Sequence, residues 1–274
     1  MLATMKSPKE QALDRVVLRH LAEGGKAREL GKLLVSDPEI QALQDYANEV
    51  AIKRLGYNDH GPVHMRQVAV NALHMLDLLH QAGIKTSLEE EDGGSYEDSV
   101  SAVLLASFLH DLGMTISRND HEVTGTIIAR PIMQRLLEAL YPDNLAERTA
   151  IISVATEGIY GHMATHQIHS LEAGLVLVAD GCDMEKGRAR IPMMLNHGEQ
   201  GEVGDIHKYS ANAIEHVEIS RGEEHPIKIE VTMSSDVGYF QVEEVLLQKI
   251  GKSPDKRFVE VYATVIGGER KRYL

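Results

Sequence analysis

His110 and Asp111 stand side by side near the end of the most hydrophobic segment of the chain, Leu-Leu-Ala-Ser-Phe-Leu-His-Asp-Leu-Gly, residues 104–113. A carboxylate buried among apolar side chains is costly unless a metal ion or another partner compensates its charge. The dipeptide therefore indicates either a metal site or a buried pair that neighbouring polar groups satisfy.

Three other segments supply residues of the same two types, at or near the ends of predicted apolar helices. They contain His60 and His64, then His121, and finally Asp180 at the end of Leu-Val-Leu-Val-Ala-Asp. Imidazole and carboxylate ligands together suit Mn, Fe, Co, Ni or Zn. The chain has 14 histidines, so a single one says little, but this placement favours metal coordination.

The order and contexts of these residues resemble the HD superfamily of metal-dependent phosphohydrolases, over roughly residues 57–192. The resemblance rests on His64 in His-x-x-x-Val-Ala, on Leu-His-Asp-Leu-Gly around His110 and Asp111, and on Val-Ala-Asp ending at Asp180. It implies an HD-type helical bundle in which these four residues hold one divalent transition-metal ion.

Two-metal members of the superfamily have one further histidine after the His-Asp pair and another before the last aspartate. By this resemblance His121, in His-x-x-x-Gly, and His162 hold a second ion, and Asp111 bridges the two. His166 and His169 compete with His162 for this role. One or two ions are therefore expected.

His60 precedes His64 by four residues, and Pro62 is suited to the first position of the helix between them. Cyclic-nucleotide phosphodiesterases of related fold have a similar His-x-x-x-His arrangement, in which the first histidine donates a proton to the leaving group. The resemblance implies that His60 is a general acid. The alternative is an exposed histidine beside a helix.

Lys186, Arg188 and Arg190 alternate just beyond Asp180, so an extended chain would point all three to one side. Because arginine grips phosphate through paired donors, the triplet is a candidate substrate clamp, with a solvated loop as the alternative. Asp183 is a candidate to orient a ligand histidine or to pair with one of these cations.

These residues predict hydrolysis of a phosphoester or phosphoanhydride, of a small nucleotide-like substrate, by metal-activated hydroxide. Two alternatives stay open. One is a di-iron oxygenase with the same ligands, since some HD relatives hold a di-iron pair that oxidises a C–H bond with oxygen. The other is a catalytically silent nucleotide-binding regulator.

Composition limits the other possibilities. A net charge of −13 argues against a nucleic-acid polymer as partner, since such a surface needs clustered Lys and Arg. The lone Cys182 allows no disulfide framework and favours a reducing compartment. We found no secretory or membrane-spanning run, so the prediction is a cytoplasmic protein without a membrane partner.

Apolar periodicity predicts a mainly α protein. The expected helices cover residues 38–55, 62–83, 100–113, 121–140 with a kink at Pro131, and 144–156, while residues 89–98 form an exposed connection. Residues 170–182 could be a helix or a buried strand.

After about residue 212 the pattern changes to strands. Residues 227–233 and 258–265 alternate with period two, and residues 241–250 between them have one helical face. We therefore predict an HD-type helical domain over residues 1–211 and a small α+β (strand-strand-helix-strand) subdomain over 212–274. Its exposed strand edge could pair in a homodimer.

Overall fold

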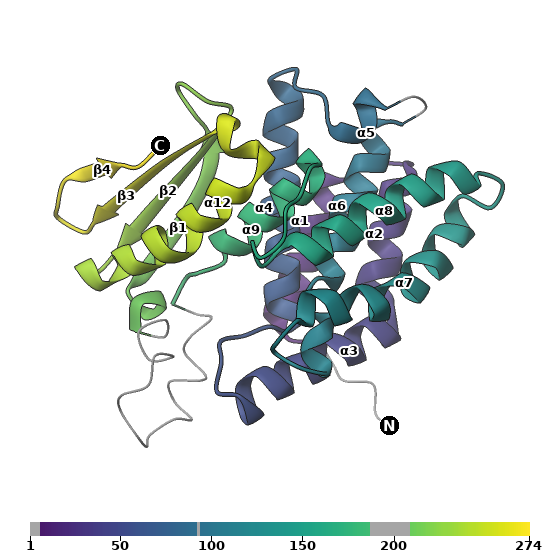
Figure 1. Cartoon of the computed structure of the whole chain (residues 1–274), viewed down its shortest axis with the longest axis horizontal. Coiled ribbons are helices and arrows are strands. Elements are labelled where there is room, and N and C mark those ends of the chain that lie inside the picture. The colour runs from purple at the N-terminus through teal and green to yellow at the C-terminus, as the bar shows by residue number, and fades with distance from the viewer. Residues whose placement is uncertain (1–5, 92–93, 187–208) are drawn as a thin grey trace.

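The computed structural model describes residues 6–91, 94–186 and 209–274 and shows a mainly helical protein with a small C-terminal sheet (Figure 1). The fold class predicted from the sequence is confirmed. The helical part contains α1 (Pro8–His20), α2 (Lys26–Ser36), α3 (Pro38–Glu49), η1 (Val50–Arg54), α4 (Pro62–Gln81), α5 (Ser87–Glu90), α6 (Tyr96–Leu109), η2 (Leu112–Thr115), α7 (His121–Leu140), α8 (Leu145–Gly161) and α9 (Leu171–Cys182).

The helix boundaries follow from capping residues. Ser7, Asp37, Ser95 and Ser170 each accept a hydrogen bond from a backbone N–H in the first turn of the helix that follows. The cap at Ser170 decides the ambiguous segment, which is the helix α9. Pro131 lies inside α7 and has no backbone N–H to donate to the preceding turn. The helix nevertheless runs from His121 to Leu140.

Helix α6 is the centre of the bundle, between α4 and α8, and every residue from Asp98 to Leu109 is buried. Its predicted end at Gly113 is wrong. The α-helix ends at Leu109, and the chain tightens into the 3-10 helix η2, which packs against α7. The expected connection 89–98 is also too long, because α5 extends to Glu90 and α6 begins at Tyr96. Ser95 caps α6, and the Asp98 carboxylate accepts a hydrogen bond from the Ser95 backbone N–H.

Helices α1 and α2 have no counterpart among the predicted elements. Their apolar residues lie among charged ones, yet these helices pack on α4 and α6 and contribute Val17, Leu30 and Leu34 to the core. Among the described residues, no helix combines the length and the apolar character needed to cross a membrane.

The C-terminal unit is a four-stranded mixed sheet with one helical crossover. The strands lie in the order β1 (Ile214–Arg221), β2 (Ile227–Met233), β3 (Val259–Val265) and β4 (Arg270–Arg272). Strands β2 and β3 are parallel and the outer pairs antiparallel. The crossover consists of η3 (Asp236–Gly238), η4 (Gln241–Leu246), α12 (Leu247–Lys252) and η5 (Pro254–Phe258).

This unit packs directly on the helical bundle. One face of β2 buries Ile227, Ile229, Val231 and Met233 in the same apolar cluster that fills the bundle. Strand β1 contacts α4, and α12 contacts α9 (Figure 1). The crossover helix is therefore held beside the end of α9, where Asp180 lies.

Gly113 marks the closest approach between η2 and α7. A Cβ atom at this position would lie 1.9 Å from the carbonyl oxygen of His121 and 2.7 Å from the backbone nitrogen of Gly125. Backbone atoms cannot move aside as a flexible side chain can. The glycine therefore sets the distance between Asp111 and His121.

Gly113→Ala should destabilise the protein by about 1–3 kcal/mol, because the methyl group forces η2 away from α7. Urea unfolding followed by circular dichroism measures the change. Gly251→Ala is the matched control, since nothing lies within 4 Å of a Cβ placed there, and it should be neutral or slightly stabilising. Equal effects of the two substitutions would contradict the tight contact.

Candidate metal centre

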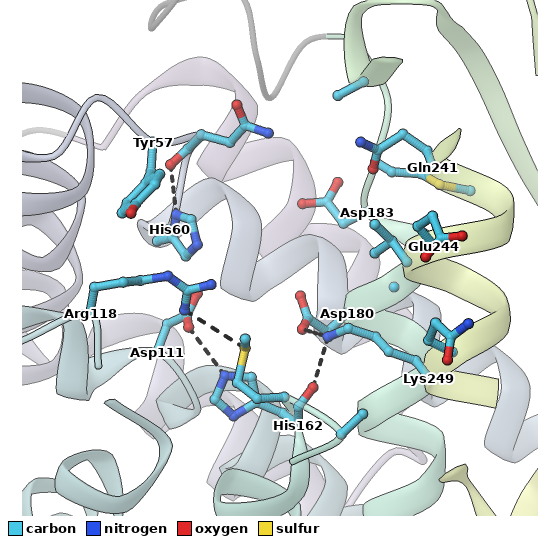
Figure 2. Close-up of a pocket in the computed structure, with 18 residues that line it drawn as sticks. Tyr57, His60, Asp111, Arg118, His162, Asp180, Asp183, Gln241, Glu244 and Lys249 are labelled. Carbon is cyan, nitrogen blue, oxygen red and sulfur yellow. Dashed lines mark hydrogen bonds and ion pairs between the residues drawn. The ribbon is translucent and has the colours of Figure 1, made fainter. Parts of the chain in front are cut away.

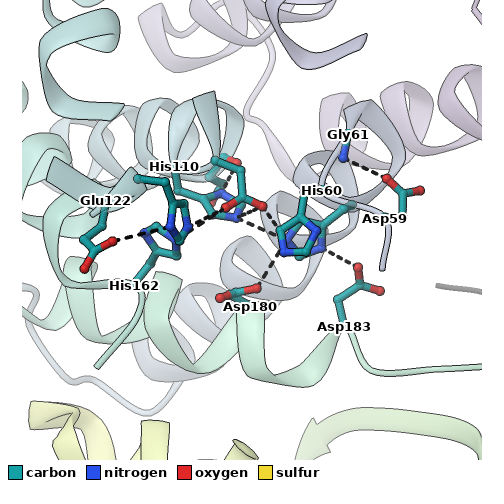
Figure 3. Close-up of polar contacts among 12 residues, drawn as sticks. Asp59, His60, Gly61, His110, Glu122, His162, Asp180 and Asp183 are labelled. Atoms are coloured by element: carbon teal, nitrogen blue, oxygen red, sulfur yellow. Dashed lines mark hydrogen bonds and ion pairs between the residues drawn. The ribbon is translucent and has the colours of Figure 1, made fainter. Parts of the chain in front are cut away.

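Four histidines and two aspartates from different elements meet in one buried cluster (Figure 3). His64 lies in the first turn of α4, His121 begins α7, and Asp180 lies in the last turn of α9. His110 and His162 directly follow the last residues of α6 and α8. The side chains of all six are at most 8% exposed.

The Asp111 carboxylate lies between two pairs of histidines. Its Oδ2 is 3.3 Å from His64 Nε2 and 3.4 Å from His110 Nε2. Its Oδ1 is 3.2 Å from His121 Nε2 and 3.4 Å from His162 Nε2. Each carboxylate oxygen thus faces its own pair of ring nitrogens.

The opposite ring nitrogens are engaged by hydrogen-bond acceptors, which fixes the tautomers. Nδ1 of His110, His121 and His162 lies 2.7–2.9 Å from the backbone carbonyl three residues earlier, and Nδ1 of His64 lies 2.6 Å from Asp183 Oδ2. A carbonyl or carboxylate only accepts, so Nδ1 carries the proton and Nε2 keeps its lone pair.

Two further groups lie near Nδ1 of His121, namely Arg118 Nη1 at 3.1 Å and Glu122 Oε2 at 3.4 Å. The shorter contact, 2.9 Å to the Arg118 carbonyl oxygen, favours the same tautomer as in the other three rings. The four Nε2 lone pairs therefore converge on Asp111. Within each pair of histidines the Nε2 atoms are close together. The distance is 3.2 Å between His64 Nε2 and His110 Nε2, and 3.0 Å between His121 Nε2 and His162 Nε2.

These separations match those of ligands that share a metal ion. Metal–ligand distances of about 2.1 Å at angles between octahedral and tetrahedral values place neighbouring ligand atoms about 3.0–3.4 Å apart. Asp111 Oδ2 is buried and has no hydrogen-bond partner among the described residues. The cluster contains two groups that could hold a metal ion, one of His64, His110 and Asp180 and one of His110, Asp111 and His162.

The electrostatics of the cluster favour the protonation states that bind metals. Burial opposes ionisation of Asp111, yet the surrounding imidazole rings, above all His110, hold the pKa of this carboxyl well below its usual value. Burial lowers the pKa of His162 to about 4. A charged carboxylate beside a neutral imidazole is the state a metal ligand needs.

A cavity of about 580 Å³ opens onto the cluster between the bundle and the C-terminal unit (Figure 2). Tyr57, His60 and Arg118 lie on one side of it, and Gln241, Glu244 and Lys249 lie on the other. His60 is half-buried, with its Nδ1 2.6 Å from the Asn58 carbonyl oxygen and its ring centre 5.9 Å from that of His64. A small molecule in this cavity would touch both parts of the protein.

Not all predicted residues lie at the site. Lys186 forms an ion pair with Glu215 and is absent from the residues that line the cavity, which corrects its assignment to a clamp. Arg188 and Arg190 lie outside the described residues. His166 lies against Glu122 at 3.8 Å with 31% of its side chain exposed, and His169 is exposed, so His162 is the histidine that joins the cluster.

Two basic residues that line the cavity, Arg118 and Lys249, were not predicted from the sequence. Arg118 precedes His121 by three residues, and its carbonyl oxygen accepts the Nδ1 proton of that ring, a spacing that could have been noticed. Lys249 is about 70 residues beyond the motif and has no motif of its own.

The fold and the cluster define a mainly helical protein with a buried histidine and aspartate site that could hold a metal ion. The chain belongs to the same family as the uncharacterized protein MJ1020 of Methanocaldococcus jannaschii, to which it is 39% identical over 232 residues, covering 85% of this chain and 86% of the relative. No protein-family model and no solved structure matches the chain.

His162→Ala should lower the metal content of the purified protein, because it removes one of the ring nitrogens facing Asp111 Oδ1. His166→Ala is the matched control, since that ring lies outside the cluster, and it should keep the wild-type content. Elemental analysis after reconstitution with each candidate metal measures both. The reverse result would move the predicted ligand to His166.

Asp183→Asn should weaken metal binding about 10–100-fold, as is typical for a residue that orients a ligand histidine. The amide keeps the size of the carboxylate but loses the charge that holds the His64 Nδ1 proton. Competition with a chromophoric chelator measures the affinity. Asp143→Asn, at an exposed position, should leave it unchanged, and an unaltered affinity in Asp183→Asn would contradict the orienting role.

Proposed function

We propose that the protein is a metal-dependent phosphohydrolase of the HD type that cleaves a phosphoester or phosphoanhydride of a small, nucleotide-like substrate. The observation that supports this most strongly is the position of Asp111, with one carboxylate oxygen facing each of two histidine pairs. The resemblance of the motifs around His64, His110 and Asp180 to that superfamily agrees with it.

In this proposal the chain holds two divalent transition-metal ions. His64, His110, Asp111 and Asp180 hold the first, and Asp111, His121 and His162 hold the second. When bound, such ions activate water as a nucleophile and polarise the phosphoryl oxygens. A nitrogen-rich set with two carboxylates suits Mn, Fe, Co, Ni or Zn rather than Mg, which prefers oxygen ligands.

The remaining residues bind the substrate and move a proton. The Arg118 guanidinium lines the cavity beside His121 and offers donors to phosphate oxygens. His60 lines the same cavity, with Nδ1 donating to the Asn58 carbonyl. In the doubly protonated ring, Nε2–H is the group that would protonate the departing oxygen and leave the ring neutral. The cavity volume is within the range of small-molecule sites.

The test is hydrolysis of p-nitrophenyl phosphate, bis(p-nitrophenyl) phosphate and a panel of nucleotides by protein loaded with each metal in turn. The wild type should release phosphate or a nucleotide product, and Asp111→Ala should lose turnover and bound metal together, because both histidine pairs lose their shared carboxylate. Asp143→Ala, an exposed aspartate between α7 and α8, should behave as wild type.

Two results would contradict the hydrolase. Nucleotide binding without any product would favour the silent regulator. Consumption of oxygen by iron-loaded protein, without phosphate release, would favour the oxygenase.

A further inference from the structure

Lys249, in the crossover helix α12 of the C-terminal unit, reaches across to the buried histidine and aspartate cluster. Its ammonium group forms an ion pair with Asp180 Oδ2 and donates a hydrogen bond of 2.7 Å to the carbonyl oxygen of His162 (Figure 2). Its side chain is 12% exposed. One lysine therefore contacts a residue from each of the two groups that could hold a metal ion.

The two oxygens of Asp180 have different surroundings as a result. Oδ1 lies 3.2 Å from His64 Nε2 and so faces the cluster. Oδ2 is the oxygen that forms the ion pair with Lys249. Without the lysine, a carboxylate at the end of α9 could turn so that both oxygens approached the histidines.

We propose that Lys249 is a positioning residue, which reserves Oδ1 of Asp180 for the metal ion and withholds Oδ2 from it. This inference rests on the proposed metal-dependent function. It gives the C-terminal unit a direct part in the site, because α12 belongs to the crossover between β2 and β3. Keeping one carboxylate oxygen away leaves a coordination position that water or substrate can take.

The packing around Lys249 supports a fixed position. Gly181 follows Asp180, and a Cβ there would lie 3.1 Å from Lys249 Cδ and 3.3 Å from Leu246 Cδ1. Leu246 and Ile250, on either side of the lysine in the chain, are fully buried. Burial opposes ionisation of Asp180, yet the charge of Lys249 holds the pKa of that carboxyl well below its usual value.

Visible absorption of the Co²⁺-substituted full-length protein tests this role, because the intensity of Co²⁺ bands falls as the coordination number rises. Lys249→Met keeps the length of the side chain and removes its charge, and Lys249→Arg keeps the charge. Lys252→Met is the matched control, an exposed lysine on the same helix. Lys249→Gln keeps a donor without the charge and replaces the Met variant if that does not fold.

We expect Lys249→Met to bind Co²⁺ with the wild-type stoichiometry but with weaker visible bands, since Oδ2 joins the ion. Hydrolysis of p-nitrophenyl phosphate should fall about 10–100-fold in kcat with little change in KM. Lys249→Arg should restore much of the band intensity and the rate. Lys252→Met should match wild type in both.

Two outcomes would overturn the inference while leaving the hydrolase intact. One is a wild-type Co²⁺ spectrum in Lys249→Met, and the other is an equal loss in Lys252→Met, which would indicate a general effect on the helix. A wild-type protein that binds no Co²⁺ would instead remove the proposed function, and the role of Lys249 with it.

Discussion

The Asp111 carboxylate is buried at the meeting point of four imidazole rings, and the surrounding structure is arranged to keep it charged there. An isolated carboxylate in an apolar interior would take up a proton instead. Here the pKa is held low by His110 and His60, and one oxygen has no hydrogen-bond partner among the described residues. A bound cation would be the simplest partner for that oxygen, which agrees with a cluster whose residues could hold a metal ion.

The helical bundle meets this constraint with ordinary backbone geometry. His110 and His162 lie just beyond helix ends and His121 begins α7, and in each case a carbonyl oxygen three residues earlier accepts the Nδ1 proton. Orientation of these three rings therefore needs no further side chains. His64 is the exception, because it lies inside the first turn of α4 and depends on the carboxylate of Asp183.

The sequence predicted the mainly helical class, the long helices and the residues of the cluster, because apolar periodicity and short motifs are local signals. It could not predict that α6 ends at Leu109 and that the chain continues into η2, which packs on α7. It also could not show that Lys186 turns to Glu215. Both outcomes depend on residues that only the tertiary fold brings together.

Lys249 illustrates the same limit at the site itself. A basic triplet beside Asp180 in the sequence seemed the natural source of positive charge, yet the ammonium group that pairs with this aspartate comes from a helix far along the chain. That helix is fixed by its neighbours β2 and β3, whose parallel pairing requires a crossover on one face of the sheet. The small sheet thus has a structural consequence at the cluster, because it sets where the crossover helix must lie.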